Sequence, residues 1–375
     1  MKKKGVSRRD FMKLGVCSTL ALGSGGIINS CGKELVSEPS SVPQINASVA
    51  AIKGNNLDSM TRDAIEAIGG MDSVVNEGET VFIKPNFVTF PWAQYNNCFH
   101  IGECTKPEIL IATAEECLKA GASEVIIGDG SQMKTFDWNY SYTLDGGTNL
   151  VKEAARLNQE YAGTITLSCL EVDHPCTHEI PSSIHPSGIF LVSGVYEKAD
   201  KIISIPVAKT HQWAQLTLAL KNFIGVLSIS EYGTDLGSHW DRGQLHINPK
   251  AIDHSSVRAI SQAIIDIVAA KKPDLTLIDF SIGLEGNGPS TGAGGTTVNV
   301  KDRLGKWLIL ASRDIMAADA TAARVMNHHV PSIKQLTMGY EMGLGEINKE
   351  SIEMIGESLP GIVMQWEAAS LANSL

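Results

Sequence analysis

Residues 80–85 of the chain read TVFIKP, a short apolar run bounded by turn-forming residues, which is typical of a buried β-strand. Thr105, with Glu108 three residues later, predicts a capped helix start, and Gly121 is placed to end that helix. Residues 123–128, SEVIIG, predict the next strand. Strand, helix and strand form one βαβ unit, and such units build parallel sheets.

The same alternation of strand and helix patterns continues to about residue 356. Further strands are predicted at residues 201–207, 275–279 and 307–311. Further helices are predicted at residues 213–223, 255–270 and 314–327. We therefore expect an α/β fold in which a mostly parallel sheet carries helices on both faces, in a Rossmann-like three-layer arrangement.

The amino-terminal residues resemble an export signal. Residues 7–13, SRRDFMK, place paired arginines before a Phe and a Lys, ahead of a glycine-rich, mildly apolar stretch. This pattern is typical of a twin-arginine signal, which export machinery recognises on proteins that have already folded. A permanent transmembrane helix is the weaker interpretation, because Lys13 and several glycines interrupt the stretch.

The signal ends in a motif, INSC at residues 28–31, that resembles a bacterial lipoprotein cleavage box. Cys31 would then carry a lipid that holds the protein at the membrane; the alternative is ordinary cleavage nearby, with Cys31 incidental. Ser and Pro residues after it predict a flexible tether. The expected organisation is a signal peptide at residues 1–30, a tether at 31–55 and a single α/β domain at 56–375 with its core at about 78–356. The expected location is the periplasm or the surface of the cell envelope.

The charge balance limits the class of partner. The formal net charge of -10 becomes -15 once residues 1–30, which carry a net charge of +5, are removed. No basic cluster remains to follow a phosphate backbone, so we expect no nucleic-acid partner. An anionic ligand would need a local positive site within this negative field.

Polar residues follow the predicted strands at the point where each strand ends. They are Lys84-Pro85-Asn86, Asp129-Gly130, Lys209-Thr210-His211, residues 285–289 (EGNGP) and Arg313-Asp314. In open parallel sheets, ligands bind beyond the carboxyl ends of the strands, so these segments are expected to surround one crevice. The alternative is that such loops are simply polar, and that Asp129 or Asp314 caps a helix.

Residues 283–295 contain six glycines and are the best candidate for a loop whose backbone closely approaches a ligand. The spacing fits neither the dinucleotide fingerprint nor the P-loop. A mobile turn without a ligand is the alternative.

Cysteine and histidine gather in two places. Cys98, His100 and Cys104 lie within seven residues, and Cys169, His174, Cys176 and His178 lie within ten. Neither group has the paired short spacing of a zinc or iron-sulfur site. Disulfides, free thiols and a metal site therefore all stay open, while Cys117 within its helix is expected in the core.

Several motifs together resemble the domain-of-unknown-function family 362. They are residues 84–86 (KPN), 120–122 (AGA), 127–130 (IGDG), 209–211 (KTH), 217–225 (TLALKNFIG), 285–289 (EGNGP) and 312–314 (SRD) followed by Asp319. The resemblance covers about residues 78–356 in matching order. Several relatives carry ferredoxin-like cysteine clusters and are described as iron-sulfur proteins. This chain has no such cluster, so an iron-sulfur cofactor is not expected within it.

The resemblance implies a set of site residues with three kinds of role. The expected catalytic residues are Lys209, His211, Lys221 and His246. The expected cofactor-binding residues are Lys84, Asn86, Asp129, Asn222, Gly286, Gly288 and Arg313. The expected metal ligands are Glu285, Asp314 and Asp319, so a divalent metal or an organic cofactor is suspected.

Two kinds of function follow from this mixture of Lys, His and acidic residues. The first is an enzyme that acts on a small anionic organic molecule through Lys and His acid-base chemistry, aided by a metal or cofactor. The second is a non-catalytic lipoprotein that binds a ligand or a redox partner, linked to iron-sulfur electron transfer as in relatives. The expected partners are a small anionic ligand, the twin-arginine export machinery and, through Cys31, the membrane.

The amino-terminal motif generates the first testable prediction. Replacing both Arg8 and Arg9 with lysine should prevent export, because the receptor recognises the arginine pair. Cell fractionation followed by immunoblotting checks this, with Lys2→Arg as the matched control outside the motif. Mass analysis of the mature protein should find a lipid on Cys31. Unchanged export of the double variant would refute the twin-arginine signal, and a mature amino terminus without lipid would refute the lipid anchor.

Overall fold

The computed structural model describes residues 44–131, 133, 136–173, 175–179, 189–233, 242–246 and 256–370. The export signal, the cleavage box with Cys31 and residues 31–43 of the predicted tether lie outside these residues, as do His174 and the side chains of Cys176 and His178. The prediction of a flexible tether up to residue 55 is wrong for its second half, because Ala47–Gly54 forms a strand that pairs on both sides within the sheet. Pro43–Leu375 forms one compact unit. None of the described helices has the length and apolar character needed to cross a membrane.

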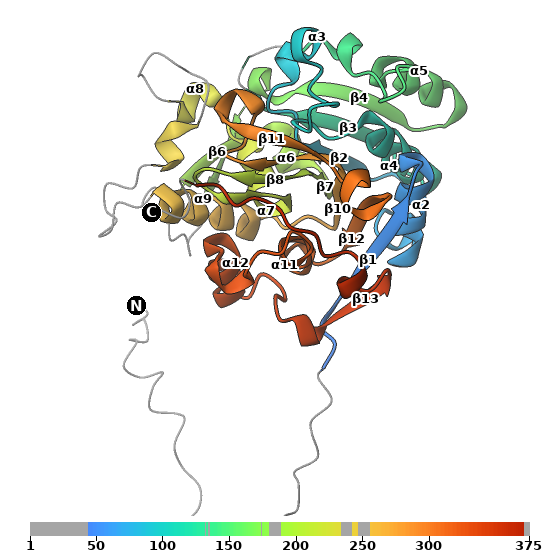
Figure 1. Ribbon diagram of the computed structural model, residues 1–375. Helices are drawn as coiled ribbons and strands as arrows, with labels where there is room; N and C mark the ends of the chain where they lie inside the picture. Colours follow the sequence, from blue (N-terminus) through green and yellow to red (C-terminus); the bar gives the residue numbers. More distant parts are fainter. Residues whose placement is uncertain are drawn as a thin grey trace, which may run out of the picture. The chain divides into compact units, whose positions relative to one another are not determined.

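The centre of this unit is a mixed β-sheet (Figure 1). Its principal strands are β1 (Ala47–Gly54), β2 (Thr80–Pro85), β3 (Glu124–Asp129), β4 (Thr164–Cys169), β7 (Lys201–Ile205), β10 (Leu275–Gly286), β12 (Trp307–Ser312) and β13 (Ile352–Gly356). They are ordered β13-β1-β12-β10-β7-β2-β3-β4, and of these eight β12 alone runs antiparallel to the rest. The predicted mostly parallel α/β sheet is confirmed.

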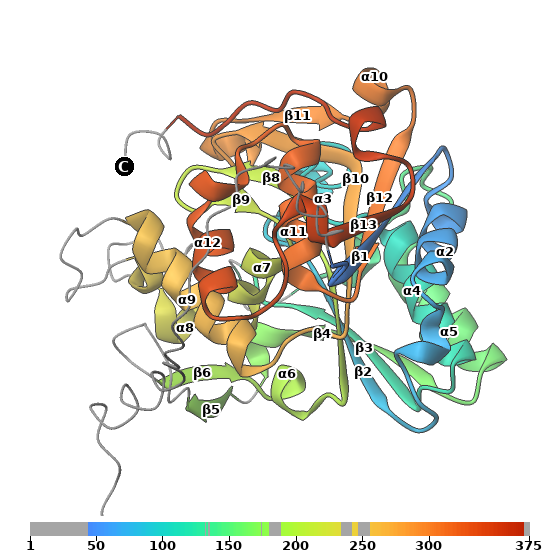
Figure 2. The ribbon, with the colours of Figure 1, turned by 90° about the horizontal axis from the view of Figure 1, so that it is seen from below.

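Helices cover both faces of the sheet, as Figure 2 shows. One face carries α2 (Leu57–Ala67), α4 (Pro107–Lys119) and α5 (Leu150–Glu160). The other face carries α7 (Ala219–Asn222), α9 (Ser256–Ala270), α11 (Ile315–Val325) and α12 (Lys334–Glu341). Successive side chains of β2 point to opposite faces of the sheet and so contribute to both layers. Val81 and Ile83 pack in the core beneath α2 and α4, whereas Phe82 packs in the core on the other face.

Shorter elements complete the unit. They are α3 (Ala93–Asn96), β5 (Pro175–Glu179), β6 (Ile189–Ser193), α6 (Gly194–Lys198), β8 (Val207–His211), β9 (Gln215–Thr217), α8 (Ile229–Tyr232), β11 (Gly295–Asn299) and α10 (Lys301–Leu304). A single 3-10 turn, η6 (Gly243–His246), contributes to the site described below.

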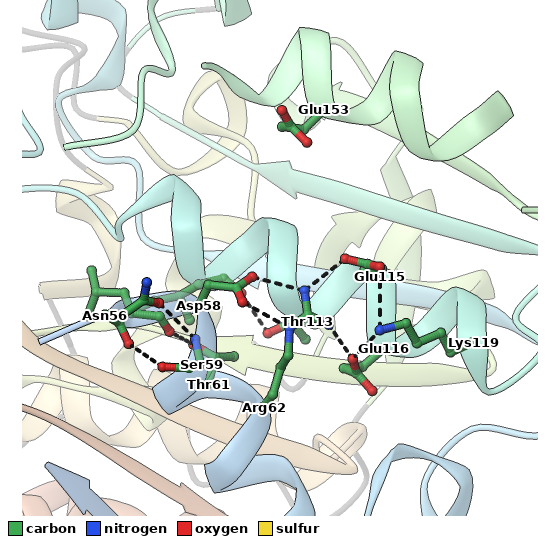
Figure 3. Close-up of polar contacts among 12 residues, drawn as sticks. Asn56, Asp58, Ser59, Thr61, Arg62, Thr113, Glu115, Glu116, Lys119 and Glu153 are labelled. Carbon is green, nitrogen blue, oxygen red and sulfur yellow. Dashed lines mark hydrogen bonds and ion pairs between the residues drawn. The ribbon is translucent and has the colours of Figure 1, made fainter. Parts of the chain in front are cut away.

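A network of charged side chains joins α2 to α4 on the outside of the sheet (Figure 3). Arg62 of α2 lies 2.9 Å from Asp58 of its own helix and 2.8 Å from Glu115 of α4, and it also contacts Glu116. Lys119 reaches Glu116 from one turn further along, at 2.9 Å. One arginine shared among three carboxylates fixes the spacing of the two helices more firmly than an isolated surface pair would.

Two local predictions are wrong. The predicted capping box of α4 does not form, because Thr105 donates to the carbonyl of Ile205 at 2.6 Å and Glu108 accepts from the backbone of Leu144 at 2.6 Å. Both side chains connect the helix start to its surroundings instead of to each other.

The predicted helix at residues 213–223 is likewise absent. The chain forms the hairpin β8-β9 and then the single-turn helix α7. The strand predicted at 201–207 ends early at Pro206, and the chain resumes as β8. β8 is thereby paired on both sides, by β10 and by β9, so its backbone groups are satisfied in a way a helix at this position would not allow.

Asp319 of α11 holds α7 in place. This buried carboxylate accepts the backbone N–H of Ala219 at 2.8 Å and that of Leu220 at 2.9 Å. Burial raises the pKa of Asp319 to about 7, although the two N–H groups oppose the shift.

Asp319→Ala should lower the free energy of unfolding by about 2–4 kcal/mol, because two buried N–H groups lose their acceptor. Asp319→Asn keeps one acceptor oxygen and should cost about half as much. Urea denaturation followed by circular dichroism measures both, with the exposed Asp302→Ala as the control. Equal stability of the alanine variant and the parent would contradict this role.

Candidate functional site

The order in which successive strands are added to the sheet reverses at β2. β3 and β4 lie on one side of β2, whereas β7 and then β10 lie on the other. In open α/β sheets this reversal leaves a crevice beyond the carboxyl ends of the two strands where the order turns. A cavity of about 100 Å³ lies here, lined by residues that follow several strands.

Half of the residues expected at the site line this cavity. They are Lys84, Asn86, Asp129, His211, Lys221, Asn222 and His246. β2, β3 and β8 supply Lys84, Asp129 and His211, respectively, at their carboxyl ends.

A buried ion pair between Lys84 and Asp129 forms one wall of the cavity. Lys84 Nζ also donates to the carbonyl of Pro85 at 2.7 Å and to Asn222 Oδ1 at 3.3 Å. The second carboxylate oxygen of Asp129 accepts the backbone N–H of Phe87 at 2.6 Å. Asn222 returns a hydrogen bond to the carbonyl of Lys84 at 2.7 Å. The charge of Lys84 is therefore fully used inside the protein.

Lys209 lies directly behind the cavity wall. Its ammonium donates to three neutral oxygens: Asn86 Oδ1 at 2.8 Å, the carbonyl of Glu103 at 2.7 Å and the carbonyl of Pro289 at 3.4 Å. Burial lowers the pKa of Lys209 to about 8, partly offset by the thiol of Cys104 and the carboxylate of Glu103. The lysine positions Asn86 and Pro289, both of which line the cavity.

His211 is buried at the end of β8, and its own hairpin fixes its tautomer. Nδ1 accepts the backbone N–H groups of Trp213 at 3.1 Å and Ala214 at 3.2 Å, so the ring proton resides on Nε2. Burial, and then the charges of Lys221, His246 and Lys209, hold the pKa of His211 well below its ordinary value. The ring is therefore a neutral hydrogen-bond donor at the cavity.

Lys221 is half-buried in the cavity and has no acidic partner or hydrogen-bond acceptor within the described part of the chain. Burial is the main cause that lowers its pKa to about 7, and the charges of Lys209, Arg242 and Lys84 add to it. Its amine consequently changes protonation near neutral pH.

Arg242 and His246, the residue before η6 and the last residue of η6, line another wall of the cavity. Arg242 forms an ion pair with Glu171, whose other oxygen accepts the backbone N–H of Ile229 at 2.9 Å. The ring of His246 packs edge-on against Trp213 at 5.0 Å between centroids. Burial, followed by the charge of Lys221, lowers the pKa of His246 to about 3. Its buried Nδ1 has no hydrogen-bond partner among the residues described.

Sequence reasoning missed Arg242 and Trp213 as lining residues. The available signal for Arg242 was its position four residues before His246 in a turn-rich segment. Trp213 was assigned to a helix that does not exist, which concealed its place in the β8-β9 hairpin loop.

Gly286 and Gly288 lie beside β8 and do not line the cavity. The carbonyl of Gly286 accepts the hydroxyl of Thr210 at 2.8 Å. A Cβ on Gly288 would lie 2.2 Å from the carbonyl oxygen of Thr210, so only glycine fits there. These glycines allow the chain to pass close to β8 and to bring Pro289 to the cavity.

Glu285 and Arg313 lie away from the cavity. Glu285 forms an ion pair with Arg303 at 2.7 Å and accepts the backbone N–H of Glu367 at 2.8 Å. It neighbours Leu284, which pairs in register with Lys209, so its side chain points to the opposite face. Arg313 follows β12, and because that strand is antiparallel its carboxyl end lies at the other edge of the sheet.

The three expected metal ligands do not form a metal centre. Asp314 caps α11 by accepting the backbone N–H groups of Met316 at 2.8 Å and Ala317 at 3.0 Å, Asp319 holds α7, and Glu285 is paired with Arg303. Among the described residues there is no group of three or more His, Cys, Asp or Glu side chains that could hold a metal ion.

The four cysteines whose side chains the structure describes, Cys98, Cys104, Cys117 and Cys169, are reduced thiols. Cys98 and Cys104 are buried and interact with each other, and Cys104 Sγ lies 3.7 Å from the hydroxyl of Thr89. Cys117 is buried in α4 as expected, and Cys169 is half-buried. His100 is exposed and does not join the thiols.

The fold has distant likenesses among solved structures. The lactate racemase apoprotein from Thermoanaerobacterium thermosaccharolyticum is 15% identical at a TM-score of 0.29, covering 63% of this chain and 51% of that one. A protein from Thermotoga maritima is 13% identical at a TM-score of 0.32, covering 62% and 53%. The chain thus spans about half the length of these structures.

Sequence comparison finds a more complete relative. A thylakoid-associated protein of Synechocystis sp. is 21% identical over 315 residues, which cover 84% of each chain. A family model described as a domain of unknown function, DUF362, matches residues 81–324, from β2 to α11, and so includes every residue that lines the cavity. The predicted family is confirmed, and the chain belongs to the DUF362 family.

Proposed function

We propose that the cavity binds a small organic anion and that Lys221 and His211 carry out acid-base chemistry on it. The observation that carries this proposal is the unpaired, half-buried ammonium of Lys221 in a cavity whose other lining cations, Lys84 and Arg242, already have carboxylate partners. A bound carboxylate would supply the counter-charge that the described residues leave out.

The electrostatics favour an anion over a neutral ligand. Lys84, Lys221 and Arg242 line the cavity, and Lys209 lies just behind it, whereas Asp129 and Glu171 are the carboxylates paired with this group. Among the described residues, cations at the cavity therefore outnumber carboxylates, although the whole chain carries a formal charge of -10. Such a local excess attracts anions within a negative field.

The two reactive groups have complementary roles. Lys221, with its pKa near 7, supplies a base or an acid at neutral pH. Neutral His211 donates from Nε2 and would stabilise negative charge that develops on a substrate oxygen. The pair suits proton transfer on a small acid at the cell envelope, the location that the amino-terminal motif predicts.

The size of the cavity limits the ligand. A volume of about 100 Å³ corresponds to about three water molecules in the liquid. Acids of three or four carbon atoms are of this size, so propionate is a suitable first probe.

Propionate binding should weaken as the pH rises through about 7, because the deprotonated amine of Lys221 no longer attracts the carboxylate. The expected loss of affinity is about tenfold per pH unit between pH 7.5 and 9. Isothermal titration calorimetry of the full chain measures this. Lys221→Met should abolish the pH dependence and most of the binding, while the exposed control Lys152→Met should change neither. If the affinity for propionate is unchanged both by pH and by Lys221→Met, the proposal is wrong.

Lys221→Met should also stabilise the fold. Below pH 7 the folded protein holds an unpaired, partly desolvated ammonium, whereas in the unfolded chain the same amine keeps its ordinary pKa of 10.5. The penalty is full below pH 7 and disappears as the pH rises to 10.5, because the folded state releases its proton first. Since the ammonium keeps some contact with solvent, we expect a gain of about 1 kcal/mol at pH 6.5 that shrinks toward pH 10.

Lys271→Met provides the contrast for this stability measurement. Lys271 donates to the carbonyls of Tyr196, Glu197 and Ala199 at 3.0, 2.8 and 2.7 Å, so its removal should destabilise the protein. Chemical denaturation of both variants across the pH range distinguishes them. If Lys221→Met also destabilises the protein, Lys221 has a structural role.

A further inference from the structure

We propose that Lys221 is a covalent nucleophile that forms an imine with a small 2-oxo acid, whose carboxylate the cavity holds and whose carbonyl carbon the amine attacks. The inference rests on the proposed anion site and names the class of substrate within it. It starts from a difference among the three lysines of the site.

Only one of these lysines has a nitrogen free to react. Lys84 Nζ contacts a carboxylate, a carbonyl and an amide oxygen, and Lys209 Nζ donates to three oxygens. Both nitrogens have their hydrogen-bonding capacity used up within the protein. Lys221 Nζ has no such contact in the segments that the structure describes, so its lone pair becomes available on deprotonation.

The surroundings of Lys221 favour the neutral amine. Arg242 and Lys84 line the same cavity and disfavour a further positive charge. Trp213, Ile224 and Ile260 line the cavity as well. Their apolar surface limits the water around the amine, and this favours the imine because water is a product of imine formation.

The position of Lys221 is fixed from both sides along the chain. Asp319 holds the backbone N–H groups of Ala219 and Leu220, the two residues before it. Asn222, the residue after it, donates to the carbonyl of Lys84 at 2.7 Å and to the hydroxyl of Ser204 at 3.1 Å. A short helix held at both ends fixes the backbone position from which the side chain of Lys221 reaches the cavity.

The chemistry balances without an oxidant or reductant. The lone pair of Lys221 forms a bond to the carbonyl carbon, and the nitrogen then passes a proton to the former carbonyl oxygen, giving a carbinolamine. His211 Nε2–H can donate to that oxygen while charge develops on it. A second proton, taken from solvent in place of the one that the ammonium released, reaches the same oxygen, so that the carbon-oxygen bond breaks and water leaves. The resulting protonated imine carries the same single positive charge as the lysine ammonium, so the electrostatic attraction to the carboxylate persists.

The test traps this bond with borohydride. Full-length protein is incubated at pH 7.5 with pyruvate and sodium borohydride, digested and mapped by mass spectrometry. A reduced 1-carboxyethyl group is expected on Lys221, at an occupancy at least about tenfold above that of any exposed lysine, because an ordinary lysine is almost wholly protonated at this pH. Label spread evenly over lysines, or found on Lys84 or Lys209 instead, would overturn the proposal.

Matched probes and variants separate the steps. Lys221→Arg keeps the charge but cannot form the imine, so the label should disappear, whereas Lys152→Arg should leave it unchanged. Acetaldehyde, which lacks the carboxylate, should label Lys221 at least about tenfold less than pyruvate. Because peptide mapping locates the adduct in the parent protein, the result stands even if a variant fails to fold.

The outcomes distinguish this inference from the proposed function. If propionate binds with the expected pH dependence but pyruvate leaves no adduct on Lys221, the imine is excluded and the anion site stands. If neither propionate binding nor adduct formation is observed, the anion site itself is wrong.

Discussion

The arrangement of the cavity depends on the buried ion pair between Lys84 and Asp129. Two unit charges withdrawn from water impose a large desolvation cost, which is offset only when every remaining hydrogen-bonding position is filled. That requirement draws in the backbone of Phe87, the carbonyl of Pro85 and the amide of Asn222. It also excludes a side chain at residue 225, where a Cβ would lie 2.3 Å from Asp129 Oδ1. The carboxyl ends of β2 and β3 and the end of α7 are joined through this one contact.

A second buried ion pair, between Lys106 and Asp279, joins separate elements on the other side of β7. Lys106 Nζ lies 3.2 Å from Asp279, and the backbone N–H of Lys106 donates to the same carboxylate oxygen at 3.2 Å. Both side chains are fully buried. The pair connects the start of α4 to the long strand β10, so the two halves of the sheet are tied together by charge as well as by backbone pairing.

Much of the fold could be predicted because its signals are local. The strands at 80–85 and 307–311 and the helix at 255–270 are strongly periodic segments, and the structure has them within one residue. His211 was found because it follows a predicted strand, and Asn222 was found because it lies in a motif of the family resemblance. The helix predicted at 213–223 failed because the apolar spacing of a hairpin followed by one helical turn imitates a helix. The direction of β12 was not readable either, since it is set by the pairing with β1 and β10. That error placed Arg313 at the wrong edge, and the partner of Arg242 was hidden because Glu171 lies 71 residues away.

The β8-β9 hairpin has a consequence for how this site can vary. The imidazole of His211 receives its two hydrogen bonds from main-chain N–H groups only two and three residues away. Any residue except proline can supply such an N–H group, so the tautomer is insensitive to the side chains at positions 213 and 214. The backbone of a three-residue turn thus sets the orientation of the ring. Neighbouring side chains are left free to adapt the cavity to different ligands without disturbing which nitrogen carries the proton.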